Sequence, residues 1–153
     1  MRLNSDFGTA FHALLIISEQ SKVQKVTSDV IADFLGTTPV LVRRLLSKLK
    51  KAGFISIAPR KEKEGTTLAM QLSDITLFDL FAAVEPDYMN AIHEPTTRLA
   101  KCSQTGVYSN QILTGYVNIA INSLKESFGK ITLADALAEL KNINHESPYE
   151  NQP

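Results

Sequence analysis

The chain has 153 residues, of which 44% are hydrophobic, and this fits one compact globular domain or a small domain with an appended element. Its single cysteine, Cys102, excludes a framework of internal disulfides and any metal site that needs several thiolates from this chain. The net charge of zero hides a separation: residues 1–72 carry eleven basic against six acidic residues, residues 73–153 carry five against ten, and the basic first half is therefore expected to meet a polyanion.

Two helices are predicted at the start of the chain. Apolar residues recur at helical spacing over residues 4–20, and Ser5 or Asp6 can cap this first helix. After a polar connector, Thr27 opens a second helix that Gly36 ends. The apolar face of the second helix is expected to contain Val30, Ile31, Phe34 and Leu35.

Residues 37–53 predict a short, strongly basic helix. Thr37 or Thr38 can cap its start, Pro39 suits the first helical position, and Gly53 suits a left-handed stop. Its apolar stripe is expected to consist of Leu41, Leu45, Leu46 and Leu49. The remaining surface is polar or cationic, with Arg43, Arg44, Ser47, Lys48, Lys50 and Lys51.

Two short helices joined by a tight glycine-containing turn are typical of a helix-turn-helix whose second helix reads DNA. Residues 54–58 and 66–70 predict two strands, and the polar segment 59–65 between them forms the charged tip of a hairpin. The sequence therefore predicts a mainly α fold with a small β-hairpin wing, a winged helix-turn-helix, in residues 1–85.

The second half is predicted to be helical. One helix starts at Ser73 or Asp74, residues 86–106 form a loop, residues 107–142 hold a long helix to residue 128 and a short final helix, and residues 143–153 form a disordered tail. The long helix either packs on its own domain or pairs with a second subunit, and we favour the dimer because dimeric readers engage two half-sites. The predicted dimerisation face is Ile112, Leu113, Tyr116, Val117, Ala120, Leu124 and Phe128.

The position of a residue on the basic helix or the wing predicts which part of the DNA it can contact. The start of the basic helix can approach base edges, an arginine can bond guanine, and lysines suit phosphates, Lys50 among them. Cations at the wing tip can enter a narrow minor groove. The predicted DNA-binding residues are Thr37, Thr38, Pro39, Val40, Arg43, Arg44, Ser47, Lys48, Lys51, Arg60, Lys61 and Lys63.

Motifs for catalysis are missing from the sequence. It has no phosphate-binding loop, dinucleotide fingerprint, nucleophile elbow or zinc-protease motif, so we expect no enzyme, no catalytic residue and no metal site. It also lacks a signal-peptide core and an apolar run of about 18 residues, so we expect a cytoplasmic protein without a membrane partner. Two other functions stay open, a winged-helix module that binds proteins and a metabolite-responsive sensor.

Six short segments carry a resemblance to a known family: residues 10–14 (AFHAL), 39–44 (PVLVRR), 49–53 (LKKAG), 74–77 (DITL), 83–85 (AVE) and 131–135 (ITLAD). With them the chain resembles the Rrf-two family of bacterial winged-helix transcription regulators, most closely its YwnA-like branch. The resemblance implies a homodimer joined mainly through the long helix and bound to a palindromic operator. We expect a repressor.

The sequence departs from this family in two places. The family's wing usually holds several glycines followed by tyrosine, whereas residues 64–69 read EGTTLA. Members that sense iron, nitric oxide or redox state hold an iron–sulfur cluster with three cysteines, so with Cys102 alone no cluster is expected. Cys102 follows Lys101, and a neighbouring cation favours the thiolate. A redox switch at Cys102 and a thiol without a sensing role both remain open.

Overall fold

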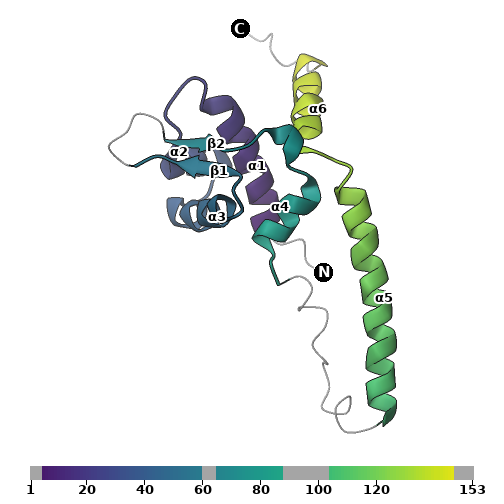
Figure 1. The fold of residues 1–153 in the computed structure, drawn as a ribbon. Helices are drawn as coiled ribbons and strands as arrows, with labels where there is room; N and C mark the ends of the chain where they lie inside the picture. Colours follow the sequence, from purple (N-terminus) through teal and green to yellow (C-terminus); the bar gives the residue numbers. More distant parts are fainter. Residues whose placement is uncertain (1–4, 60–64, 88–103, 147–153) are drawn as a thin grey trace.

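The structure is a computed structural model that describes residues 5–59, 65–87 and 104–146. It confirms a mainly helical fold with a two-stranded hairpin (Figure 1). The elements are α1 Ser5–Gln20, α2 Ser28–Leu35, α3 Pro39–Lys51, β1 Ile55–Ile57, β2 Thr66–Leu68, the 3-10 helix η1 Leu72–Asp74, α4 Leu77–Val84, α5 Gln104–Phe128 and α6 Leu133–Glu146. None of the described helices is both long and apolar enough to cross a membrane.

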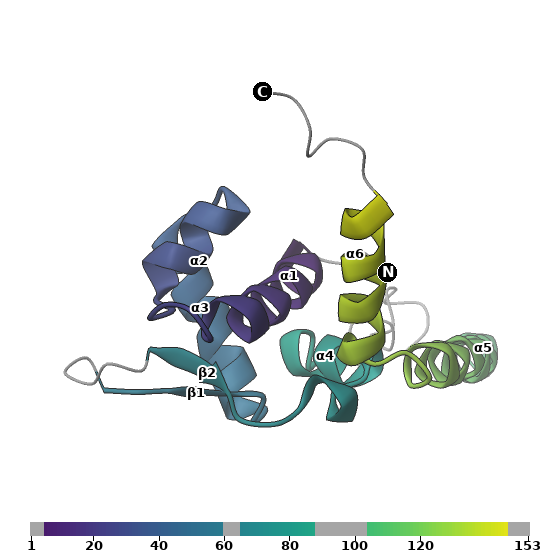
Figure 2. The same cartoon turned by 90° about the horizontal axis from the view of Figure 1, so that it is seen from above.

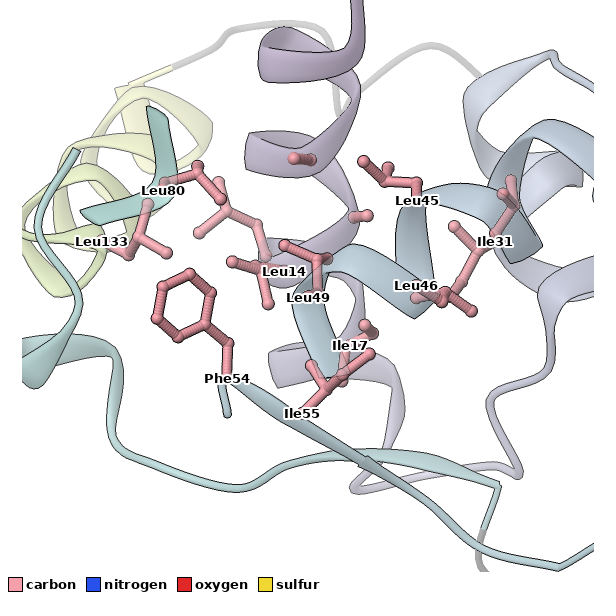
Figure 3. Packing of buried hydrophobic residues seen from close by; sticks show 14 of the residues in the cluster. Leu14, Ile17, Ile31, Leu45, Leu46, Leu49, Phe54, Ile55, Leu80 and Leu133 are labelled. Carbon is pink, nitrogen blue, oxygen red and sulfur yellow. The ribbon is translucent and has the colours of Figure 1, made fainter. Parts of the chain in front are cut away.

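Helix α1 lies at the centre of the core. Its residues Leu14 and Ile17 are fully buried and face the buried side of α3, where Leu49 is also fully buried. Figure 3 shows these side chains converging with those of the hairpin and α4. Seen from above, α1 runs between the α2–α3 pair on one side and α6 on the other, with α5 farther out (Figure 2). The core thereby fixes α3 against α1, α2, α4 and β1 and leaves one of its faces outward.

The predicted ends of α2 and α3 are confirmed. The hydroxyls of Thr27 and Thr38 accept hydrogen bonds from the amides three residues ahead, which satisfies amides of the first turn. Gly36 and Gly53 both have positive φ, at 60° and 81°. After α3, the Gly53 N–H donates to the Lys50 carbonyl and the Phe54 N–H donates to the Leu49 carbonyl, each at 3.0 Å. This pair of bonds is a Schellman motif, and it directs Phe54 back into the core.

The predicted apolar faces of α2 and α3 are each wrong at one position. Leu41 is 46% exposed, and Val42 takes its place in the core. In α2, Phe34 is exposed and Ala32 is buried instead. The buried residues of α3 are spaced by three and four residues, whereas the predicted stripe followed Leu41, Leu45 and Leu49 in steps of four, with Leu46 beside them. Steps of four drift around the helix, and the true face is centred on Val42, Leu45, Leu46 and Leu49.

The hairpin is anchored to the connector between α1 and α2. Its antiparallel register pairs Ile55 with Leu68. At the end of β2 next to the turn, the Thr66 N–H donates to the Val26 carbonyl at 2.8 Å. The neighbouring Gly65 lies so close that an added Cβ would be 2.3 Å from the Val26 oxygen. A glycine is therefore required here, because any side chain would push the wing off its anchor.

The C-terminal segment is joined to the winged-helix body by two similar turns. Thr76 pairs with Thr132 in an isolated antiparallel bridge. The Leu77 N–H donates to the Ile131 carbonyl and the Leu133 N–H to the Ile75 carbonyl, both at 2.9 Å. Thr76 also caps α4, so this helix starts later than the predicted Ser73 or Asp74, which belong to η1. Buried Leu133 holds the start of α6 in the core.

Helix α5 begins at Gln104, three residues before the predicted start at 107, and ends at Phe128 as predicted. Helix α6 continues to Glu146, so residues 143–146 are helical although the sequence predicted a disordered tail from 143. Residues 147–153 lie outside the described part of the chain. The predicted loop 86–106 is likewise described only at its two ends, residues 86–87 and 104–106.

Candidate nucleic-acid interface

The outward face of α3 lies opposite its buried side. Val40, Arg44, Ser47 and Lys51 follow one another at helical spacing along the centre of this face, and all four are exposed. Val40 is 69% exposed at the first turn. The face thus presents an apolar side chain at the helix start and cations along its length, a combination that suits base edges at one end and phosphates at the other.

A groove separates α3 from the wing. It measures about 450 Å³ and is open between the start of α2, α3 and the hairpin; we call it the wing groove. Among the described residues, its lining includes the cationic side chains of Lys25, Arg43 and Lys50. Lys25 was missed by the sequence prediction. In the sequence, Lys25 is marked only by its position next to the apolar Val26. The hydrogen bond between the hairpin and Val26 brings Lys25 beside α3, and this long-range contact cannot be predicted from the sequence.

Arg43 is oriented by the start of α2. Its Nε donates to the Ser28 Oγ at 3.2 Å, and its Nη2 lies 3.8 Å from the Asp29 Oδ1. Both charged side chains are more than half exposed, so this ion pair contributes only about 0–1 kcal/mol. The contact leaves Arg43 at the mouth of the wing groove.

Arg44 and Lys48 share one carboxylate, that of Asp6 in α1. The Arg44 Nη2 lies 3.1 Å from Asp6 Oδ1 and 3.3 Å from Oδ2, and the Lys48 Nζ lies 3.0 Å from Oδ2. Lys48 also donates to the Val84 carbonyl at the end of α4, at 2.8 Å. Burial opposes ionisation of Asp6, but the hydrogen bonds and charges of Lys48 and Arg44 outweigh it and lower its pKa.

The structure brings together most of the predicted DNA-binding residues of α3. Thr38, Pro39 and Val40 form its first turn, and Arg43, Arg44, Ser47 and Lys51 follow on its exposed side, with Thr37 in the turn before the helix. Lys48 is set apart, since its ammonium points to α1 and α4 rather than outward. Arg60, Lys61 and Lys63 of the wing tip, and Cys102, lie outside the described residues.

Helix α5 has two apolar faces, an inner one that packs on its own chain and an exposed outer one. The predicted dimerisation face contains residues of both. Phe128 stacks on Phe7 of its own chain with ring centroids 5.9 Å apart, and Val117 and Leu124, on the same side, are half-buried. Ile112, Leu113, Tyr116 and Ala120 are exposed. Two further exposed residues, Tyr108 and Ile119, extend the outer side. We call Tyr108, Ile112, Tyr116 and Ile119, at helical spacing, the outer stripe.

A winged helix-turn-helix with a cationic face on its second helix defines a class of DNA-reading proteins. The chain belongs to the Rrf2 family (Rrf-two), whose model, described as an iron-dependent transcriptional regulator, matches residues 3–139. The family is one of transcriptional regulators and not of enzymes.

Among proteins of known sequence, the chain is similar to the HTH-type transcriptional regulator YwnA of Bacillus subtilis, with 37% identity over 93 residues. This match covers 60% of the chain and 66% of YwnA, and the chain spans less than two thirds of each curated relative that it matches. A transcriptional regulator from Lactobacillus plantarum is similar in structure, with a TM-score of 0.70, 28% identity and coverage of 92% of this chain and 95% of that one. IscR of T. potens, at 18% identity and a TM-score of 0.67 over 100% of this chain and 94% of its own, shares the fold.

The family's description includes iron, but the donor residues of this chain lack what a cysteine-held iron–sulfur cluster needs. Such clusters are held mainly by several cysteine thiolates, and the whole sequence contains one cysteine. Within the described residues, no group of three or more His, Cys, Asp or Glu side chains could hold a metal ion. The donor set therefore does not fit a cysteine-held cluster.

Proposed function

We propose that the protein is a homodimeric transcriptional regulator, a repressor, that binds a palindromic operator through α3 and the wing. The observation that carries this proposal is the outward face of α3, where Val40, Arg44, Ser47 and Lys51 stand clear of the core beside the wing groove. A repressor of this kind acts by occupying DNA, and two copies of the face give the affinity that one α3 lacks.

The residues of α3 contact different parts of the DNA, depending on their position along the helix. Thr38, Pro39 and Val40 meet base edges, and the exposed Val40 suits the methyl group of thymine. Arg43 and Arg44 bond guanines, each worth about 1–3 kcal/mol of discrimination. Ser47, Lys50 and Lys51 contact phosphates, which add affinity without sequence preference. Arg60, Lys61 and Lys63 of the wing tip stay proposed minor-groove ligands.

Dimerisation is proposed through the outer stripe of α5. Tyr116, at 67% exposure, and Ile119, at 64%, are large apolar side chains that a monomer would leave in water. In Figure 1 the helix extends well beyond the winged-helix body, so this part of α5 is accessible to a second subunit. A two-fold contact between equivalent stripes would bury both, as expected of a closed dimer.

The regulator is proposed to act in the cytoplasm without a cofactor. Its one cysteine cannot replace the thiolates of an iron–sulfur cluster. Cys102 stays a candidate for redox regulation. A Cys102→Ser variant whose DNA binding remains as sensitive to oxidant as the wild type would exclude that role.

The test of DNA binding is a fluorescence anisotropy titration of a selected operator duplex and of a scrambled duplex. We expect Arg43→Ala with Arg44→Ala to weaken operator binding by at least about tenfold, because two guanine contacts are lost. Lys130→Ala with Lys141→Ala removes the same charge far from α3 and serves as the control. Equal losses in both double variants would reduce the role of α3 to general electrostatics.

One observation favours regulation by a metabolite. A cleft of about 470 Å³ lies between α6 and η1, with Leu72 and Leu137 in its wall and Lys141 at its edge. Its position next to the joint between α6 and the winged-helix body would let an anionic ligand alter how α5 is held. Thermal-shift screening of anionic metabolites, compared between wild type and Lys141→Ala, tests this alternative.

A further inference from the structure

We propose that Asp6 of α1 is a positioning residue that determines the specificity of operator binding, by orienting Arg44 and by keeping Arg44 and Lys48 from indiscriminate phosphate contacts. The inference rests on the proposed function, since it concerns how α3 reads DNA. It starts from the ion pairs that one carboxylate makes with two cations of the recognition helix.

Asp6 holds Arg44 from the inner side. The Asp6 side chain is 17% exposed, whereas that of Arg44 is 61% exposed. Both contacts to Asp6 use Nη2. Within the described residues Nε and Nη1 of Arg44 have no other partner, so the outer edge of the guanidinium remains available for a base. An arginine loses rotamer freedom when a partner fixes it, and Asp6 fixes Arg44 before DNA arrives.

Lys48 holds the Asp6 carboxylate in a fixed position beside Arg44. Its ammonium bonds Asp6 Oδ2 and the Val84 carbonyl, which belong to α1 and α4. Three elements therefore meet at this ion-pair cluster of Asp6, Arg44 and Lys48. Asp6 cannot follow Arg44 outward without losing Lys48, and Arg44 is held in the direction that α1 imposes.

Asp6 also limits non-specific binding. Its negative charge lies against the two cations that would otherwise approach phosphates from this side of α3. Each further phosphate contact steepens the dependence of log K on log salt by about 0.9. Removal of the carboxylate is therefore expected to strengthen binding to any DNA while loosening the arginine that selects a base.

The chain offers a matched control on the same helix. Glu19 lies at the other end of α1 and pairs with Lys22 and Lys141, neither of which belongs to α3. Glu19→Gln changes the net charge by the same amount as Asp6→Asn but leaves α3 untouched. A general effect of charge on DNA binding appears in both variants, and a positioning effect appears only in Asp6→Asn.

The experiment titrates full-length wild type, Asp6→Asn and Glu19→Gln with operator and scrambled duplexes over a series of salt concentrations. For Asp6→Asn we expect a tighter scrambled complex, a salt slope steeper by about 1–2, and an operator-to-scrambled ratio lower by about 5- to 100-fold. Glu19→Gln should keep the wild-type ratio and slope. In an Arg44→Ala background, Asp6→Asn should no longer change the ratio.

Asp6→Glu gives an independent check if Asp6→Asn folds poorly by circular dichroism. It keeps the charge but displaces the carboxylate, so the ratio should fall while the salt slope stays near the wild-type value. A folded Asp6→Asn or Asp6→Glu with the wild-type ratio would overturn the proposal. Wild type without any operator preference would instead contradict the proposed function itself, so the two failures are distinguishable.

Discussion

Thr76 and Thr132 pair across an isolated antiparallel bridge, and each caps the helix that follows it. Each hydroxyl also donates to an aspartate three residues ahead, Thr76 to Asp79 at 2.6 Å and Thr132 to Asp135 at 2.7 Å. Two matching capping boxes thus start α4 and α6 side by side. Because α5 ends just before this joint, the joint fixes the long helix to the winged-helix body.

Loss of one cap should weaken the joint. Thr132→Ala removes the acceptor for the Asp135 N–H, and we expect it to lower the free energy of unfolding by about 0.5–2 kcal/mol. Urea unfolding measures the change. Ser127→Ala, at an exposed position of α5, is the control and should be neutral to within about 0.5 kcal/mol. A neutral Thr132→Ala would mean that the bridge does not depend on its cap.

Gly65→Ala should destabilise the protein by about 1–3 kcal/mol, because the new Cβ would meet the Val26 carbonyl at 2.3 Å. Gly8→Ala is the matched control, since a Cβ at Gly8 meets nothing within 4 Å and the residue lies inside α1. This control should gain about 0.5–1 kcal/mol from helix propensity. Thermal unfolding of both variants shows whether the close approach of Gly65 to Val26 exists in solution.

Tyr116→Glu should convert the proposed dimer into a monomer, because it places a charge in the middle of the outer stripe. Asn118→Glu adds the same charge to α5 at an exposed polar position and should leave the dimer intact. Sedimentation equilibrium measures both. A wild type that is monomeric at micromolar concentration, or a dimeric Tyr116→Glu, would place the subunit contact elsewhere or exclude it.

The ionised form of Asp6 is favoured in the fold, since Lys48 and Arg44 lower its pKa below the ordinary value of 3.8 against the opposing effect of burial. A group with a lowered pKa stabilises the fold above its unfolded value and loses this contribution as pH falls through the folded value. Stability should therefore fall below about pH 4, and Asp6→Asn should flatten part of that decline. Glu19 and Asp135, whose pKa values are also lowered, account for a further part. Urea unfolding at a series of pH values measures this. If the free energy of unfolding of Asp6→Asn fell with pH as steeply as that of the wild type, the ion-pair cluster would be contradicted.

Local chemistry was predictable from the sequence. Thr27, Thr38, Gly36 and Gly53 act within one turn of their own helices, so their roles as caps and stops depend on neighbours that the sequence already supplies. The hairpin and the order of elements follow from the same short-range patterns. The buried face of α3 was predicted wrongly at Leu41, because both Leu41 and Val42 suit a core and only packing against the other elements decides which of them is buried.

Long-range contacts were not predictable. Asp6 reads as a helix cap in sequence, and its partners Arg44 and Lys48 come close only when α1 and α3 pack together. The same holds for α5, where Phe128 and Tyr116 both look like members of one apolar face. Phe128 stacks on Phe7 of its own chain, whereas Tyr116 is exposed. The helical spacing of apolar residues shows that they share a face, but it does not show what that face packs against.

DNA reading by α3 is tested by selection of genomic fragments of the source organism with the purified full-length protein, followed by sequencing. DNA reading by α3 in a dimer predicts one enriched palindrome whose half-sites lie about one helical turn, 10–10.5 base pairs, apart or a multiple of that distance. It also predicts that the enrichment disappears for Arg43→Ala with Arg44→Ala. Recovery of no enriched sequence, or the same enrichment with the double variant, would contradict DNA reading by α3.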